Sequence, residues 1–163
     1  MLLESLEGLL EAIKERSLDF YGERLVTLVV YCSVGRGVPR PNSDVDLLIV
    51  ASPLPEGRLK RMQEFSHLEE SLGGILSDMR KRGITPALSP VIKTPHEVKS
   101  GSLLFLDMIE DARILYDRDG FFAGYLDELK RKLQALGAKK VKWKGAWYWD
   151  LKPDFRRGDI IDL

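Results

Sequence analysis

The apolar residues in the first third of the chain change from a helical to a strand-like spacing. Leucines and an isoleucine at 3–13 recur at helical spacing with glutamates between them, which predicts an amphipathic helix. The runs LVTLVVYC at 25–32 and VDLLIVA at 45–51 are continuous and rich in β-branched residues, and they predict two buried strands. Between them, residues 33–43 are rich in Gly, Pro, Ser and Asn. They predict a loop with room for one helical turn.

The middle of the chain predicts a long helix followed by a third strand. Apolar positions between Glu56 and Arg82 fall on one stripe, and Gly83 then ends the predicted helix. A strand is predicted within 87–93, where Pro90 favours an edge position or a bulge.

The remaining elements are shorter. The segment Thr94-Pro95-His96-Glu97 has the form of a helix capping box with proline at the first helical position. A helix around 103–109, a strand at 114–116 and a last helix ending at Gly137 follow. The aromatic tail WKGAWYWDLKPDFRRGDIIDL is predicted to be irregular. The alternation of strands and helices predicts an α+β (mixed α/β) fold, with a small mixed β-sheet and helices packed against it.

Composition and charge narrow the class of protein. The 163 residues are 44% hydrophobic and 31% charged, which is typical of one globular domain. The formal net charge is zero, so a broad surface for nucleic acid is disfavoured. A single cysteine and an N-terminus with four glutamates indicate a cytoplasmic protein with no signal peptide and no membrane partner.

The candidate chemistry begins with two aspartates at the start of the second strand. Side chains two residues apart on a strand share a face, so Asp44 and Asp46 project together. Two adjacent carboxylates are unfavourable unless a positive charge neutralises them. Carboxylate oxygens suit Mg²⁺ or Mn²⁺, and Mg²⁺ also accepts phosphate oxygens as ligands.

The turn before these aspartates has the residues of a phosphate site. Glycines at 35 and 37 allow backbone N–H groups to converge, Ser33 adds a hydroxyl, and Arg36 adds a bidentate guanidinium. Together the turn and the acids predict a site for a triphosphate and a bridging metal ion.

Here the sequence resembles the minimal nucleotidyltransferases of the DNA polymerase beta superfamily. Their signature is Gly-Ser, ten residues, then Asp-x-Asp, usually with Ala-Arg-Gly inside the gap. This chain has Cys32-Ser33, ten residues, then Asp44-Val45-Asp46, with Gly35-Arg36-Gly37 in the gap and Ser43 before the first aspartate. The close match covers about 25–50.

The resemblance implies a nucleotidyltransferase fold and activity. The length of the chain and the lack of a dividing linker predict a single nucleotidyltransferase-like domain over 1–163, with a core of about 1–116 and a C-terminal helix and tail over about 117–163. The resemblance also implies Mg²⁺-dependent transfer of a nucleoside monophosphate from ATP to a hydroxyl of an unknown acceptor. The expected catalytic metal ligands are Asp44 and Asp46, and the expected phosphate-binding residues are Ser33, Gly35, Arg36, Gly37 and Ser43.

Two departures from the signature support a second hypothesis. Cys32 replaces the first glycine, and the strand predicted at 87–93 lacks the family's third carboxylate, with Ser89, Val91 and Lys93 on its face. Loss of general-base help costs roughly 10²–10⁴ in rate. The alternative is therefore a catalytically weak or inactive, antitoxin-like nucleotide-binding module that pairs with a HEPN-type helical protein. A third acid within ~4–6 Å of the pair would favour catalysis.

Simpler interpretations stay open for several residues. The aspartates could cap a strand entry, Arg36 could be a solvated charge, and Glu97 is better explained by capping than by catalysis. The aromatic tail, with Trp143, Trp147, Tyr148 and Trp149, could line an adenine pocket or a partner surface, but such clusters more often pack a tail onto the core. An exposed tail or strand edge would also permit a homo-oligomer.

Overall fold

A four-stranded mixed sheet forms the centre of the computed structural model, which describes all 163 residues. Its strands are β1 (Leu25–Tyr31), β2 (Val45–Ala51), β3 (Leu88–Lys93) and β4 (Arg113–Asp117), in the spatial order β3-β2-β1-β4. Strand β1 is antiparallel to β2 and β4, whereas β2 is parallel to β3. The predicted α+β (mixed α/β) fold with a small mixed sheet is confirmed.

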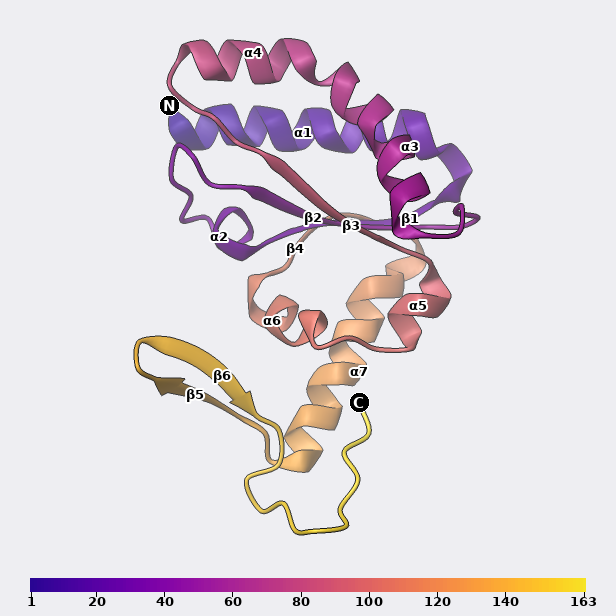
Figure 1. Cartoon of the computed structure of the whole chain (residues 1–163), viewed down its shortest axis with the longest axis vertical. Helices are drawn as coiled ribbons and strands as arrows, with labels where there is room; N and C mark the ends of the chain where they lie inside the picture. The colour runs from indigo at the N-terminus through magenta and orange to yellow at the C-terminus, as the bar shows by residue number, and fades with distance from the viewer.

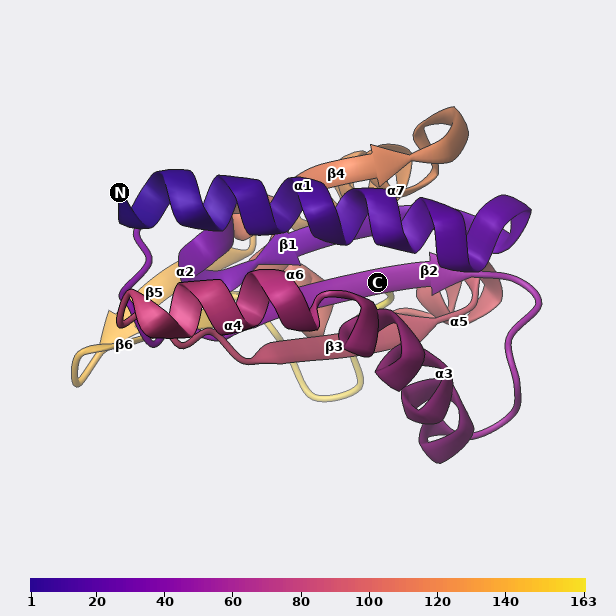
Figure 2. The ribbon, with the colours of Figure 1, turned by 90° about the horizontal axis from the view of Figure 1, so that it is seen from above.

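One face of the sheet is covered by three helices, α1 (Leu2–Tyr21), α3 (Arg58–Ser71) and α4 (Gly73–Lys81) (Figures 1 and 2). Alternate residues of β1 and β2, among them Val30 and Leu47, are buried in this layer. The predicted stripe of α1 is buried there from Leu6 to Ile13, whereas Leu3 is 55% exposed and lies outside the core.

The other face is covered by α5 (Pro95–Lys99), α6 (Leu104–Asp111) and α7 (Phe121–Leu136) (Figure 1). The second set of alternating strand residues, including Tyr31 and Leu48, packs against these helices and forms with them a second hydrophobic core, which we call the second core. Asp46 is two residues from Leu48 on β2 and therefore lies on this face. Short 3₁₀ helices at η1 (Gly22–Arg24) and η2 (Arg118–Gly120) precede β1 and α7.

Several local predictions agree with the structure. The strands fall within the predicted ranges or differ from them by a residue or two, and Pro90 lies in the edge strand β3. In the capping box, the Glu97 N–H donates to Thr94 Oγ1 at 3.2 Å and the Thr94 N–H donates to Glu97 Oε2 at 2.8 Å. Gly137 ends α7 with a left-handed φ of 69°.

The prediction of one long helix between Glu56 and Arg82 is wrong, because the helix is interrupted at Leu72 and forms two separate helices, α3 and α4 (Figure 2). The Leu72 N–H bonds to the Glu69 carbonyl three residues back, at 3.0 Å, which ends the α-helical ladder. Gly73 and Gly74 follow, and glycine is a poor helix former. The break lets the buried Leu72 join the core while α3 and α4 run in different directions.

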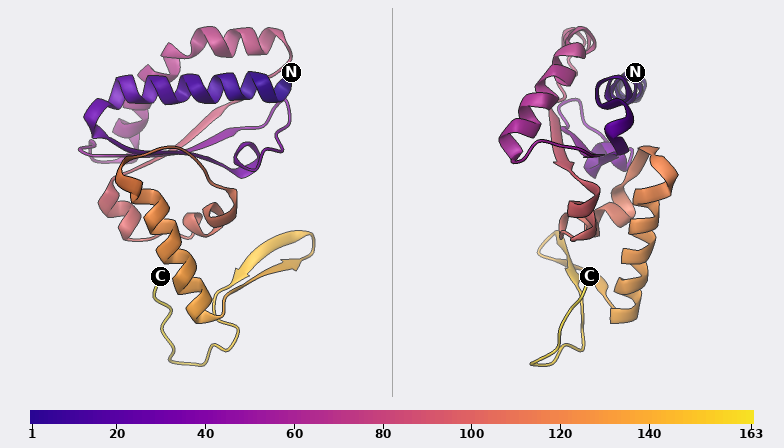
Figure 3. Two further views of the ribbon diagram at one scale, coloured as in Figure 1. Left: turned by 180° about the vertical axis from the view of Figure 1, so that it is seen from behind. Right: turned by 90° about the vertical axis from the view of Figure 1, so that its right-hand side faces the viewer.

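The prediction of an irregular C-terminal tail is also wrong for its first part. Strands β5 (Lys139–Trp143) and β6 (Ala146–Asp150) form an antiparallel hairpin. Its two turn residues, Lys144 and Gly145, have φ values of 47° and 81°, as in the type I′ turns that connect hairpin strands. The hairpin projects from the far end of α7, beyond the four-stranded sheet (Figures 1 and 3). None of the helices combines the length and hydrophobicity needed to span a bilayer.

Candidate nucleotide-binding site

The chain leaves β1 through the four-residue helix α2 (Cys32–Gly35). The Arg36 N–H bonds to the Cys32 carbonyl and the Val38 N–H bonds to the Ser33 carbonyl, both at 3.0 Å. Gly37 then adopts a left-handed φ of 74°. The predicted loop with one helical turn is confirmed, and its backbone hydrogen bonds make it compact.

Gly35 brings this turn unusually close to two other backbone segments. A Cβ atom at this position would lie 2.3 Å from the Asp111 carbonyl oxygen and 2.8 Å from the Val30 carbonyl oxygen. The close approach that glycine permits here is therefore between the turn and the C-terminal end of α6. Sequence reasoning expected an approach to phosphate and did not identify this contact.

Asp46 lies beside the turn because β1 and β2 are antiparallel neighbours. It pairs with Tyr31 on β1, which is the last residue before α2, and with Ser89 on β3. Asp46 is half-buried, and Asp44 is exposed just before β2. The alternation of the strand thus presents the Asp46 carboxylate on the face that carries Tyr31, and Asp44 lies just before the strand.

The electrostatics link Asp46 to the first residue of the turn. Burial raises the pKa of the Cys32 thiol to about 12, and the neighbouring carboxylates of Asp46 and Asp111 act in the same direction. Burial and the Asp46 carboxylate likewise raise the pKa of Tyr31 to about 12. Both groups are therefore neutral near pH 7, so Cys32 is not an activated nucleophile.

Arg36 is held by a carboxylate that the sequence did not point to. Its Nη1 atom lies 2.6 Å from Asp111 Oδ2, in an ion pair between residues 75 positions apart. The Asp111 side chain is 13% exposed, whereas that of Arg36 is 49% exposed. The pair therefore fixes one edge of the guanidinium and leaves the rest accessible.

Ser43 and Ser33 occupy different parts of the loop. The Ser43 hydroxyl accepts a hydrogen bond from the Arg40 N–H at 2.8 Å and closes a tight turn before Asp44. Ser33 is half-buried within α2, next to Cys32. The structure thus places Ser33, Gly35 and Arg36 in one turn beside Asp46, with Ser43 at the other end of the loop.

Comparison with known proteins identifies the family. A family model described as a nucleotidyltransferase domain matches residues 6–116. This chain belongs to the nucleotidyltransferase family. The matched region contains β1, β2, β3 and all of β4 except its last residue, together with the turn and both aspartates.

Individual proteins are similar to this nucleotidyltransferase domain over most of its length. A Methanocaldococcus jannaschii protein named "Putative protein adenylyltransferase MJ1305" is 28% identical over 127 residues, which cover 77% of this chain and 81% of the relative. One chain of a crystal structure described as a toxin-antitoxin with AMP-PNP has a TM-score of 0.50 and 17% identity, covering 77% of this chain and 90% of that chain. A Shewanella oneidensis structure, described as a tri-AMPylated HEPN toxin in complex with MNT antitoxin, has a TM-score of 0.43 and 14% identity, covering 77% of this chain and 90% of that chain.

Ser89 occupies the β3 position opposite Asp46 in this nucleotidyltransferase domain. No three His, Cys, Asp or Glu side chains come together in a metal-binding arrangement. Lys93 pairs with Val50, four residues along the strand from the Asp46–Ser89 pair. At about 3.3 Å per residue this is roughly 13 Å away, so Lys93 does not lie beside the aspartates.

Glu97 is engaged elsewhere, as the capping interpretation predicted. Arg61 donates to both of its carboxylate oxygens, at 2.7 and 3.0 Å. This ion pair, with the Thr94 backbone hydrogen bond, lowers the pKa of Glu97 to about 2. Glu97 is thus a structural residue between α3 and α5 and does not supply the third acid.

A cavity of about 610 Å³ adjoins the turn at 33–37, the candidate phosphate turn, and is lined by Arg36, Glu110, Asp111, Lys140 and Trp147. Trp147 of the hairpin is 60% exposed, and Trp143 and Tyr148 are similarly exposed. Of the four aromatic residues at 143–149, Trp149 alone packs against the second core. The expectation that this aromatic cluster packs the tail onto the core is therefore wrong for its other three members.

Proposed function

We propose that the domain binds ATP together with Mg²⁺ or Mn²⁺ and transfers the nucleoside monophosphate to a hydroxyl group of an acceptor. The observation that carries this proposal is the pairing of Tyr31 with Asp46. That pairing puts the glycine-containing turn directly beside the acidic start of β2. The two halves of the signature therefore form one site in three dimensions.

The residues present fit a magnesium ion. Exposed Asp44 and half-buried Asp46 offer carboxylate oxygens at the N-terminal end of β2, and Mg²⁺ commonly takes one or two protein carboxylates together with waters and phosphate oxygens. When bound, the metal ion neutralises charge on the phosphates. In this arrangement Ser33 and the accessible part of Arg36 hold the β- and γ-phosphates, while Gly37 supplies the left-handed turn and Ser43 orders the loop before Asp44.

The names of similar proteins support ATP as the nucleotide donor. The Methanocaldococcus jannaschii relative is named as an adenylyltransferase, and the structure with a TM-score of 0.50 is described as containing AMP-PNP, an ATP analogue. ATP is therefore our choice of donor for this domain.

The proposal is tested with the double variant Asp44→Asn, Asp46→Asn. Removing both charges is expected to lower Mg²⁺-dependent ATP affinity at least tenfold, measured by isothermal titration calorimetry with and without Mg²⁺. The matched control is Asp19→Asn, Asp78→Asn, which removes two exposed charges from α1 and α4 on the opposite side of the sheet. Equal ATP affinity in the two double variants would refute the proposed site.

A second candidate function is a catalytically weak or inactive antitoxin-like module that pairs with a HEPN-type helical protein. The serine opposite Asp46, where family enzymes carry an acid, favours this candidate. Incubation with ATP labelled at the α-phosphate and a HEPN-type protein distinguishes the two. Labelled partner supports transfer, whereas a stable complex without label supports the module.

We propose further that residues 1–163 form a single domain with a core of about 1–116. Packing of α7 against the central sheet supports this arrangement, as does burial of Leu163 and Trp149 against the second core. Limited proteolysis is expected to leave α7 attached to the sheet. Early release of a fragment beginning near residue 117 would contradict it.

A further inference from the structure

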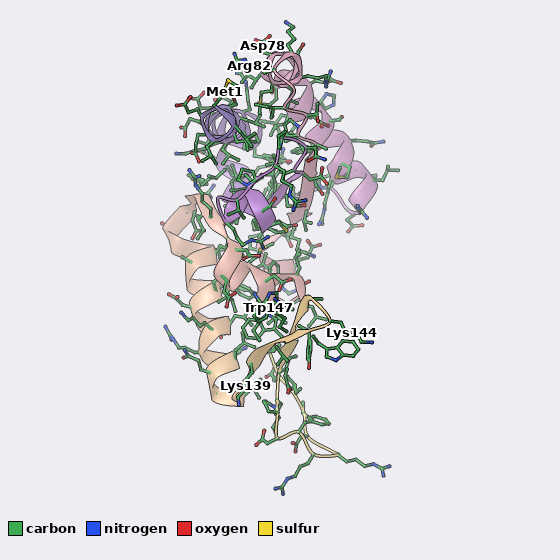
Figure 4. All side chains as sticks on the ribbon, turned by 90° about the vertical axis from the view of Figure 1, so that its left-hand side faces the viewer. Met1, Asp78, Arg82, Lys139, Lys144 and Trp147 are labelled. Atoms are coloured by element: carbon green, nitrogen blue, oxygen red, sulfur yellow. The ribbon has the colours of Figure 1, made fainter.

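One face of the C-terminal hairpin is turned towards the body of the protein. The register pairs Lys140 with Trp149 and Lys142 with Trp147, so these four side chains share a face, which we name the inner face. Lys140 Nζ lies 2.7 Å from Glu110 Oε2 at the end of α6, and Trp149 packs against the second core. Figure 4 shows Trp147 next to the body and Lys144 at the outer end of the hairpin.

The inner face forms part of the wall of the 610 Å³ cavity. Trp147 and Lys140 come from the hairpin, Glu110 and Asp111 from α6, and Arg36 from the phosphate turn. The volume lies within the range of about 300–1,000 Å³ that is typical of small-molecule sites. One cavity therefore joins the turn to an exposed indole ring.

This cavity begins at Arg36, in the turn that follows the Tyr31–Asp46 pair. Asp46 pairs with Tyr31 just before α2, and Arg36, with its ion-pair partner Asp111, follows α2 directly, so this short helix separates Asp46 from the cavity wall. In a nucleoside triphosphate the base is the end of the molecule remote from the terminal phosphates. A triphosphate bound by Arg36, and by a metal ion on Asp46, thus has its base within reach of the cavity.

Trp147 has the properties of a stacking platform. Its ring is 60% exposed and contributes little to the core, while Lys140 Nζ and Lys142 Nζ lie 5.9 and 5.8 Å from its centroid. Stacking of a base on an aromatic side chain is worth about 1–3 kcal/mol, and cations near the ring add favourable contacts to phosphate. The carboxylates of Glu110 and Asp111, both neutralised by cations, are acceptors for amino groups on a base.

We propose that this cavity receives the purine base of the donor nucleotide, stacked on Trp147. The inference rests on the proposed function, since it takes the triphosphate to lie in the turn. A purine is favoured over a pyrimidine because its two fused rings cover more of the indole. Trp147 is then a specificity-determining residue that lies outside the region matched by the family model.

The test compares Trp147→Ala with Trp143→Ala, using ATP and inorganic tripolyphosphate as ligands in the presence of Mg²⁺. Trp143 is a matched control because it is 62% exposed on the same hairpin but lies on its other face. Trp147→Ala is expected to weaken ATP binding about 5- to 150-fold, the equivalent of one stacked base. Its affinity for tripolyphosphate and both affinities of Trp143→Ala are expected to match the wild type.

A comparison of ATP with CTP tests whether the base itself is recognised. Wild-type protein is expected to prefer ATP to CTP, Trp147→Ala to lose that preference and Trp147→Phe to retain most of it. ATP affinity unchanged in Trp147→Ala, an equal loss for ATP and tripolyphosphate, or no preference for ATP over CTP in the wild type would each overturn the inference while leaving the triphosphate site intact. If wild-type protein bound neither ATP nor tripolyphosphate, the proposed function would fail, and this inference with it.

Discussion

Replacing Gly35 with alanine tests whether the phosphate turn is held by its contact with α6. The added Cβ would lie 2.3 Å from the Asp111 carbonyl oxygen, whereas ordinary van der Waals contact begins at 3.4 Å. The two segments must therefore separate by about 1.1 Å, the difference between these distances. Both obstructing atoms belong to the backbone and cannot rotate away, and overpacking of this kind typically costs about 1–3 kcal/mol.

We expect Gly35→Ala to lower the free energy of unfolding by about 3 kcal/mol, at the upper end of that range, because two carbonyl groups are obstructed at once. Urea denaturation followed by circular dichroism measures the change through the midpoint and the slope. The control is Gly8→Ala in α1, where the new Cβ meets nothing within 4 Å. Alanine there is expected to stabilise the helix by about 0.5–1 kcal/mol. A Gly35→Ala protein within about 0.5 kcal/mol of wild type, the usual range for surface changes, would refute the packing argument.

Two further predictions concern charge and backbone strain. Because the pKa of Glu97 is lowered from 4.5 to about 2 in the folded state, its ion pair with Arg61 stabilises the protein above pH 4.5 and loses this effect as the pH falls towards 2. Discounted for solvent screening, the contribution is about 1 kcal/mol, and the stability difference between wild type and Glu97→Gln should vanish on acidification; a difference that grew at low pH would contradict it. Cys32 has a left-handed φ of 58°, so Cys32→Val should destabilise the protein by about 1 kcal/mol more than Cys32→Ala in the same denaturation assay. Equal stability of these two variants would show that the conformation is not strained.

The parts of the fold that could be predicted are those with a strong local pattern. The continuous apolar run of β2 fixed its boundaries at Val45 and Ala51, and the capping box located the start of α5. The break at Leu72 was missed because the apolar stripe continues across it. What signals the break is the Gly73-Gly74 pair, whose weak helix propensity was outweighed by the periodicity.

The hairpin had a weaker signal for a physical reason. Two-residue hairpin turns favour Asn-Gly or Asp-Gly because both residues need a positive φ, whereas this turn uses Lys144 and Gly145. The alternation of lysine with apolar residues over 140–143 was nevertheless visible in the sequence and is typical of a strand. Strand alternation places Trp143 and Tyr148 on the outer face of the hairpin, where they stay exposed. Trp147 and Trp149 share the inner face, but only Trp149 packs against the core, so alternation alone does not decide which tryptophan is buried.

The contacts that complete the candidate site could not be found from local sequence at all, because they join segments far apart in the chain. Asp111 binds Arg36 and leaves no room for a side chain at Gly35, while its neighbour Glu110 binds Lys140 of the hairpin. The last two residues of α6 thus connect the phosphate turn to the inner face of the hairpin. Both Arg36 and the hairpin face that carries Trp147 are therefore held by this end of α6, so the proposed phosphate and base subsites depend on the same short segment. The sequence motif identifies the turn and the aspartates, but only the tertiary structure shows the ion pairs that connect the turn to α6 and α6 to the hairpin.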